Sequence, residues 1–228
     1  MCREKIGWKG DFMGNKIYTI GREFGSGGMD VGEKLAERLG IKLYDKELLK
    51  KAAKHSGFCE EIFENHDEKP TNSFLYSLVM DTYSVGGYAA APFLDMPLNH
   101  KVFLAQFDAI KKIAAEESCV IVGRCADYAL ADNPDCLNVF IKADLGRRVK
   151  RVAKRLNMTE NKAKDLTLKN DKQRASYYNY YSSKKWGDSS SYHLTLDSGV
   201  IGIDGCVDII LKFRECMDAQ KKSKDNLW

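Results

Sequence analysis

The chain has 228 residues, of which 44% are hydrophobic and 30% are charged. This apolar content suffices for a sizeable core and excludes a largely disordered chain, and no apolar run approaches the roughly 20 residues of a membrane-spanning helix. The N-terminal residues lack the apolar stretch of a secretory signal, so we expect a cytoplasmic protein that does not bind a membrane. Seven cysteines without a C-x-x-C pair, and only four histidines, argue against a zinc site and a disulfide framework.

The net charge of +4 is distributed unevenly along the chain. Residues 142–174 contain twelve Lys or Arg and only four Asp or Glu, so this stretch carries a charge of +8 and the rest of the chain carries −4. A stretch with this balance is a candidate site for an anionic ligand.

Strand and helix patterns alternate over the first sixty residues. Residues 17–20 are a short apolar run that ends in a glycine-rich turn, 21–28, and apolar residues at helical spacing follow as far as Gly40. Residues 41–44 predict a second strand, and Asp45 stands at the N-cap position of the next predicted helix. Because this alternation is typical of α/β folds, we expect a central parallel sheet flanked by helices.

An irregular region, residues 57–100, interrupts the pattern with acidic and then aromatic sequence that is broken by prolines. Two later apolar runs suit strands that are buried on both faces of a parallel sheet. The predicted elements after the interruption are a helix at 102–115, strands at 119–122 and 137–141, basic helices at 144–156 and 160–181, a strand at 193–196 and a helix at 207–217. Residues 1–15 are expected to form an N-terminal extension and residues 220–228 a frayed tail.

The glycine-rich turn is a candidate phosphate-binding loop because it lies between a predicted strand and a predicted helix. Backbone N–H groups and the positive end of the helix can hold a phosphate there, and glycines let the anion approach the backbone. The candidate residues are Gly21, Arg22, Gly25, Ser26, Gly27 and Gly28. The standard loop ends in Lys followed by Ser or Thr, whereas this chain has Gly28 and Met29. Arg22 is the nearest substitute cation and Ser26 the nearest hydroxyl, and a merely flexible turn is the alternative interpretation.

Arginines form a stripe along the first basic helix. The spacing of Arg148, Arg151 and Arg155 places them on one line beside the apolar face, from which they can point into a cleft and bind phosphate oxygens. The alternative is a helix face that only contacts solvent.

Other charged residues stand where ligands bind in α/β folds. Arg124 follows a predicted buried strand and Asp45 follows another, and ligands of open α/β sheets bind at the carboxyl ends of strands. Asp171 and Arg174 share a face of the second basic helix, where they can hold a sugar hydroxyl and a phosphate or simply pair with each other. Asp45 can also serve only as a helix cap.

Six segments, taken in order, carry a resemblance to a known family. They are 20–28, 43–48, 120–128, 148–151, 171–178 and 185–188. With these segments the chain resembles the cytidylate kinase-like proteins, relatives of the nucleoside monophosphate kinases, over nearly its whole length. One departure is Cys125, which stands where cytidylate kinases have the Asp of a Gly-Arg-Asp motif.

The resemblance implies a P-loop kinase fold in one domain, 1–228, with 57–100 as an acceptor-side insertion and 144–190 as a basic helical lid. It implies ATP and Mg²⁺ as cofactors and a nucleoside monophosphate, CMP or dCMP by analogy, as the phosphoryl acceptor. In this interpretation the glycine-rich loop binds the donor and Ser26 a metal ion. The implied catalytic residues are Arg22, Arg148, Arg151 and Arg155, and the implied acceptor-binding residues are Asp45, Arg124, Asp171 and Arg174.

Three alternatives remain open at this point. The chain can be a kinase for another small phosphoacceptor, because residues 57–100 match bacterial cytidylate kinase least. It can be a non-catalytic nucleotide-binding or sensor protein, because Gly28 replaces the loop lysine. A nucleic-acid binder is the weakest alternative, because the arginines border an apolar helix face and no nucleic-acid motif is present.

Overall fold

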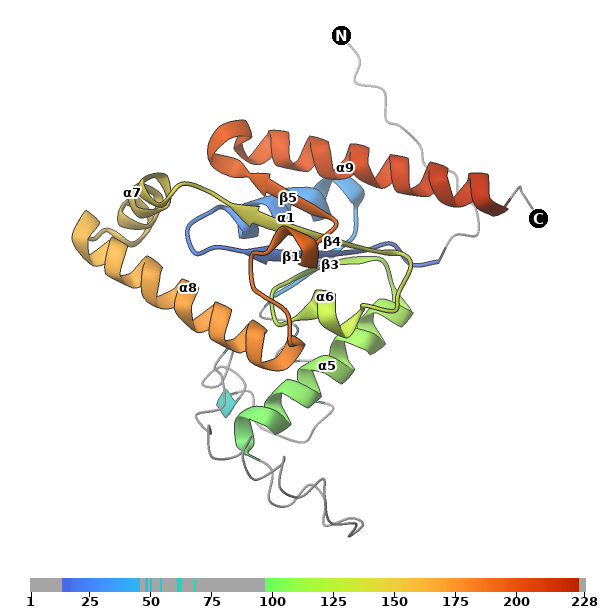
Figure 1. The fold of residues 1–228 in the computed structure, drawn as a ribbon, viewed down its shortest axis with the longest axis horizontal. Coiled ribbons are helices and arrows are strands. Elements are labelled where there is room, and N and C mark those ends of the chain that lie inside the picture. The colour runs from blue at the N-terminus through green and yellow to red at the C-terminus, as the bar shows by residue number, and fades with distance from the viewer. Residues whose placement is uncertain are drawn as a thin grey trace.

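A computed structural model describes residues 14–45 and 97–225, together with residues 48, 50, 54, 61, 62 and 68. In this part of the chain, parallel strands form one sheet with the order β2-β3-β1-β4-β5. The strands are β1 (Ile17–Arg22), β2 (Lys42–Tyr44), β3 (Cys119–Val122), β4 (Cys136–Lys142) and β5 (Leu194–Asp197). Because β1 lies between β3 and β4, the turn that follows β1 emerges near the middle of the sheet edge (Figure 1).

Helices cover both faces of the sheet (Figure 1). α1 (Gly28–Leu39) and α9 (Ser198–Asp225) lie on one face, and α5 (Leu98–Glu116) and α6 (Ala126–Ala129) lie on the other. α7 (Leu145–Leu156) and α8 (Glu160–Ser182) pack against each other and project from one end of the sheet, and a short 3-10 helix, η1 (Ser189–Ser191), precedes β5. None of the helices in the described ranges is long and apolar enough to cross a membrane.

The central strands are buried on both faces, which explains their continuous apolar sequence. Tyr18 and Ile20 pack with residues of α1 and α9, whereas Ile17, one residue earlier, packs with residues of α5. The helix partners on the first face include Val31 and Leu35 of α1 and Val207 and Ile210 of α9, and those on the second face include Ile110 and Ile113 of α5. Successive side chains of a strand point to opposite faces of the sheet, so the core consists of two layers, one on each face.

The predicted order of strands and helices is confirmed wherever the structure describes the chain, with the ends of some elements shifted. α5 begins at Leu98, before the predicted 102, and the short helix α6 was not predicted. The helix predicted after Asp45, the insertion 57–100 and the extension 1–15 lie almost entirely outside the described residues.

α9 continues to Asp225, so residues 220–225 of the expected tail are helical. Two buried or half-buried cations fasten this part of α9 to the loop before β4. The Arg214 guanidinium donates to the carbonyl of Asp135 at 2.6 Å and pairs with Asp218 at 2.8 Å, and Lys221 Nζ pairs with the Asp135 carboxylate at 2.6 Å. Ion pairs to the rest of the fold, which helix periodicity alone does not reveal, thus extend the helix.

Truncation of a buried leucine tests the sheet as the core of the fold. Leu137 of β4 is fully buried, so Leu137→Ala should lower the free energy of unfolding by about 2–5 kcal/mol through lost burial and a cavity. Leu168→Ala on α8 is the matched control, because this side chain is 46% exposed and its loss should cost less than about 1 kcal/mol. Chemical denaturation measures both, and equal losses would contradict the described core.

Candidate active site

The turn after β1 has the backbone of an anion-binding loop. Gly25 and Gly27 have φ angles of +78° and +81°, which side chains disfavour, and Gly27 caps the start of α1 without a side-chain hydrogen bond. Ser26 N–H and Phe24 N–H are engaged, by the Glu23 carbonyl at 3.2 Å and by Asp171 Oδ1 at 2.7 Å. Within the described residues nothing accepts from the N–H of Gly27 or Gly28, so these amides can donate to an anion.

Arg22 takes the space in which a side chain at position 28 would begin. A Cβ atom added at Gly28 would overlap Cβ of Arg22, so glycine at 28 and arginine at 22 are sterically linked. The guanidinium of Arg22 continues past the loop and pairs with Glu68 at 2.7 Å. The aliphatic part of the Arg22 side chain therefore occupies the space where a lysine side chain at position 28 would begin. The charged guanidinium of Arg22 lies at Glu68.

Arg148 is buried and fastens three segments together. Its guanidinium pairs with Asp171 of α8 at 2.5 Å and with Glu23 at 3.3 Å, and it donates to the carbonyl of Phe24 at 3.1 Å. Burial raises the pKa of Glu23, while the Ala143 N–H and Arg148 oppose this shift. The alternative in which Asp171 simply pairs with Arg174 is not what the structure shows, because Asp171 bridges Arg148 and the loop amide of Phe24.

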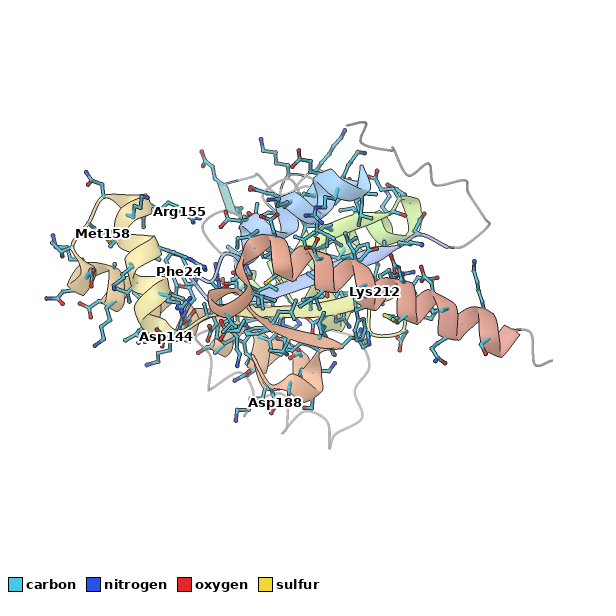
Figure 2. All side chains as sticks on the ribbon, turned by 90° about the horizontal axis from the view of Figure 1, so that it is seen from above. Phe24, Asp144, Arg155, Met158, Asp188 and Lys212 are labelled. Atoms are coloured by element: carbon cyan, nitrogen blue, oxygen red, sulfur yellow. The ribbon has the colours of Figure 1, made fainter. Side chains whose placement is uncertain are left out.

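A cleft of about 630 Å³ opens between the glycine-rich loop and α7. Its lining includes Gly25, Gly27 and Gly28 from the loop, Arg151, Lys154 and Arg155 from α7, and also Arg22, Asp45 and Arg174. Figure 2 shows Arg155 on the outward part of α7, while Phe24 lies between the sheet and α7. In the described part of the chain no carboxylate lies within ion-pair distance of Arg151, Lys154 or Arg155, so this wall carries uncompensated positive charge.

Arg151 also connects the loop to the start of α9. Its guanidinium donates to the carbonyl of Ser26 at 2.9 Å and to the hydroxyl of Ser198 at 3.0 Å, and the Ser198 hydroxyl donates to the same carbonyl. The hydroxyl of Ser26 itself is buried and has no hydrogen-bond partner among the described residues. Arg151 is thus held beside the loop by neutral groups, which leaves its charge available to a ligand.

A second cluster of positive charge lies on the other side of Arg22 and Arg174. Glu68 accepts hydrogen bonds there from Arg22 NH1 at 2.7 Å, from the backbone N–H of Arg124 at 3.1 Å and from Arg174 Nε at 3.2 Å. Burial alone would raise the pKa of Glu68, but Arg22, Arg174 and Arg124 outweigh burial and hold this pKa well below its usual range. The cluster is therefore a strong binding site for an anionic oxygen group.

Strained backbone positions Arg124. Gly123, Arg124 and Cys125 have successive φ angles of +78°, +54° and +53°, in a region that costs residues other than glycine on the order of 1 kcal/mol or more. This turn directs the Arg124 N–H toward Glu68 and lets the Arg124 guanidinium pair with Asp45 at 2.7 Å. Strain of this kind concentrates at functional sites, and here it joins the carboxyl ends of β2 and β3.

Aromatic residues close the far side of this cluster. Tyr177, Tyr178 and Tyr181 are buried against α5 and β4, and the Phe103 and Tyr181 rings stack at 3.9 Å, so these tyrosines have a packing role. Tyr178 donates to Asp127 at 2.6 Å, and burial raises the pKa of Asp127. Burial, and then the charges of Asp127 and Glu68, raise the pKa of Cys125, so its thiol stays protonated and is no nucleophile at neutral pH.

The structure brings the predicted site residues together in two groups. Gly25, Gly27, Gly28, Arg151 and Arg155 line the cleft, Arg124 lies at the second cluster, and Arg22 and Arg174 border both. Arg148 and Asp171 lie behind the loop, and Gly21 packs against Phe140 and Tyr192 below it.

Sequence reasoning missed Glu68 and Lys154. Glu68 is one of several acids in a polar stretch, and Lys154 lies next to the arginine stripe of α7 and lines the cleft with it. No signal in a single sequence separates Glu68 from its acidic neighbours.

Comparison with known proteins now gives the family. A model of the cytidylate kinase-like family matches residues 17–200. The chain belongs to the cytidylate kinase-like family. No curated protein matches it.

Solved structures agree with this family and its fold. An uncharacterized protein from Eubacterium ventriosum is 34% identical, with a TM-score of 0.66 over 88% of this chain and 99% of the other. Shikimate kinase from Bacteroides thetaiotaomicron is 13% identical, with a TM-score of 0.50 over 88% of this chain and 98% of the other, which shows a common fold. The α/β P-loop kinase fold expected for a cytidylate kinase-like protein is thereby confirmed, and family and fold are those of nucleotide-dependent kinases.

The buried contacts of Arg148 predict a loss of stability when it is replaced. Arg148→Met should lower the free energy of unfolding by about 3–5 kcal/mol, because the half-buried carboxylates of Asp171 and Glu23 would lose their cation. Arg155→Met is the control, because the exposed Arg155 has no such partner in the described residues and its replacement should change stability by less than about 0.5 kcal/mol. Urea denaturation compares the two variants, and a fully stable Arg148→Met protein would contradict the structural role.

Proposed function

We propose that this cytidylate kinase-like protein transfers a phosphoryl group from ATP to a nucleoside monophosphate, CMP or dCMP. One observation carries the proposal. Arg22, Arg124 and Arg174 form a three-arginine cluster around Glu68, and two of them, Arg22 and Arg174, also line the cleft beside the glycine-rich loop. Two anion sites that share a wall of guanidinium groups can bring two phosphates into contact, and positioning of this kind supplies most of the catalysis in phosphoryl transfer.

The donor would bind in the cleft. The unpaired amides of Gly27 and Gly28 at the start of α1 suit a phosphate group, as does the positive end of the helix. Arg151, Lys154 and Arg155 supply the charge that a polyphosphate requires, and the cleft is large enough for a nucleotide. In this proposal α7 and α8 act as the lid, and Arg148 is a positioning residue that orients α7 and the loop.

The acceptor would bind at the three-arginine cluster. The backbone N–H of Arg124 and the guanidinium of Arg174 face the position of its phosphate, and Asp45 holds the guanidinium of Arg124 in place. Asp171, paired with Arg148, accepts from the loop amide of Phe24 and so fixes the loop that would bind the donor.

The residues present also fit a magnesium ion. Ser26 has a buried hydroxyl without a partner, and Asp30 and Asp45 line the cleft, which suits a cation bound mainly through phosphate oxygens. When bound, Mg²⁺ would neutralise charge on the donor phosphates and so assist departure of ADP.

The reaction is an in-line displacement without a covalent enzyme intermediate. A phosphate oxygen of the acceptor forms a bond to the γ-phosphorus of ATP as the bond to the β-phosphate oxygen breaks, and ADP leaves. Arg151 neutralises the negative charge on the transferred group, and closure of α7 over the cleft excludes water, which would otherwise accept the phosphoryl group.

A coupled assay of ADP release with ATP-Mg²⁺ tests the acceptor class. We expect release that depends on CMP or dCMP and is slower by about 10-fold or more with AMP, GMP and UMP, because buried polar contacts discriminate strongly between bases. Release with shikimate or another non-nucleotide acceptor would favour the alternative of a different kinase. No release with any acceptor, although ATP binds, would favour a nucleotide sensor.

Replacement of Arg151 tests the proposed catalytic role. Arg151→Ala should lower kcat by about 100-fold or more if its guanidinium stabilises the transferred group. Lys150→Ala is the control on the adjacent, exposed position of α7 and should retain the activity of the unmodified protein. Steady-state kinetics with both variants decide the matter, and an Arg151→Ala enzyme of full kcat would exclude this role.

A further inference from the structure

The carboxylate of Glu68 occupies the point on which the three-arginine cluster converges. One of its oxygens accepts from Arg22 NH1 at 2.7 Å and from the Arg124 N–H at 3.1 Å, and the other accepts from Arg174 Nε at 3.2 Å. A carboxylate bound by two guanidinium groups and a backbone amide is bound as a substrate oxyanion would be. Glu68 thus lies inside a binding site and not on the surface beside it.

No second anion fits at the cluster while Glu68 is in place. The cavity bordered by Arg22, Arg124, Arg174 and the tyrosines measures about 20 Å³, which is room for about one water molecule. Gly123 makes this close packing possible, since a Cβ atom there would overlap the guanidinium of Arg22 and the carboxylate of Glu68. A phosphate group is larger than one water, so it can bind the arginines only by taking the place of the carboxylate.

The arginines hold Glu68 against its own backbone preference. Its φ angle is +48°, in the left-handed region that residues other than glycine avoid. Its carbonyl accepts from Gln173 Nε2 at 3.3 Å, a weaker contact than the ion pair to Arg22. A strained backbone conformation persists only where surrounding contacts stabilise it. At Glu68 these contacts come from the same arginines that would bind the substrate.

We propose that Glu68 is an internal substitute for the acceptor's phosphate, and that the phosphate monoester of the acceptor must displace it in order to bind. This inference rests on the proposed function for the identity of the acceptor. A phosphate monoester carries a second negative charge and a third terminal oxygen, so it compensates the arginines better than a carboxylate does. After displacement Arg22 would pair with a substrate phosphate and no longer with Glu68, beside the glycine-rich loop that lacks the standard lysine.

Glu68 consequently acts as a specificity-determining residue. Apparent affinity equals intrinsic affinity multiplied by the fraction of molecules in which the site is open, so an internal carboxylate weakens every ligand of the cluster. Dianionic phosphate esters overcome this competition, whereas acceptors that present only a hydroxyl or a carboxylate do not. ATP bound in the cleft is then protected from transfer to unsuitable acceptors that lack a phosphate.

Binding of inorganic phosphate to the full chain tests the proposal without any turnover. Glu68→Gln keeps the size of the side chain and removes its charge, and isothermal titration calorimetry should show phosphate binding about 10-fold tighter or more than in the unmodified protein. Glu37→Gln, an exposed position of α1, is the matched control and should bind phosphate as the unmodified protein does. Unchanged or weaker binding by the Glu68→Gln protein would overturn the proposal.

A second variant decides the case if Glu68→Gln does not fold. Glu68→Asp keeps the charge but shortens the side chain by one methylene, so it cannot reach Arg22 and Arg174 together, and phosphate should bind several-fold tighter. Affinity equal to or below that of the unmodified protein would overturn the proposal here too. Because neither measurement uses ATP, tighter phosphate binding alongside a failed kinase assay would reject only the proposed function. A successful kinase assay together with unchanged or weaker phosphate binding by the Glu68 variants would reject only this inference.

Discussion

The architecture of the candidate site depends on ion pairs that neutralise buried arginine side chains. Arg22, Arg124, Arg148 and Arg174 are largely removed from water, and an isolated charge in such a place is strongly destabilising. Each finds a carboxylate, and those carboxylates are Glu23, Asp45, Glu68 and Asp171. Because Glu23 follows β1, Asp45 follows β2 and Asp171 belongs to α8, these ion pairs fasten the helical projection to the edge of the sheet.

The positively charged residues of the site therefore form two groups, those that pair with carboxylates of the protein and those that do not. The guanidinium groups inside the site are neutralised by carboxylates of the protein, whereas Arg151, Lys154 and Arg155 on α7 face the cleft without such partners in the described residues. The excess of charge over residues 142–174 therefore does not act as one block. Part of it holds the fold together, and the part along the cleft supplies the potential that favours a polyphosphate over a neutral ligand.

Sequence patterns predicted the elements well because strand burial and helix periodicity are local properties. The loop after β1 and the ends of β2 and β3 were also located correctly, since parallel strands align their carboxyl ends at one edge. Side-chain partners were not predictable. Arg148 and Arg151 lie three residues apart on one stripe, yet one is buried against Asp171 and the other reaches Ser26 and Ser198. Only the tertiary fold decides which arginine meets a carboxylate, and the same holds for Glu68.

The missing lysine of the phosphate loop is best understood through Arg22 and Gly28 together. A side chain at position 28 would collide with the stem of Arg22, so the two positions cannot both carry a long cation without a backbone shift. Exchanging Gly28 for Lys alone would force Arg22 away from Glu68 and Arg174 and disturb the cluster that it helps to build. In the function proposed above, the cation beside the loop would come from Arg22 at the end of β1 and not from a lysine at position 28. Arg22 lines both the cleft and the small cavity at Glu68, so in the proposed function its charge would serve the donor and the acceptor.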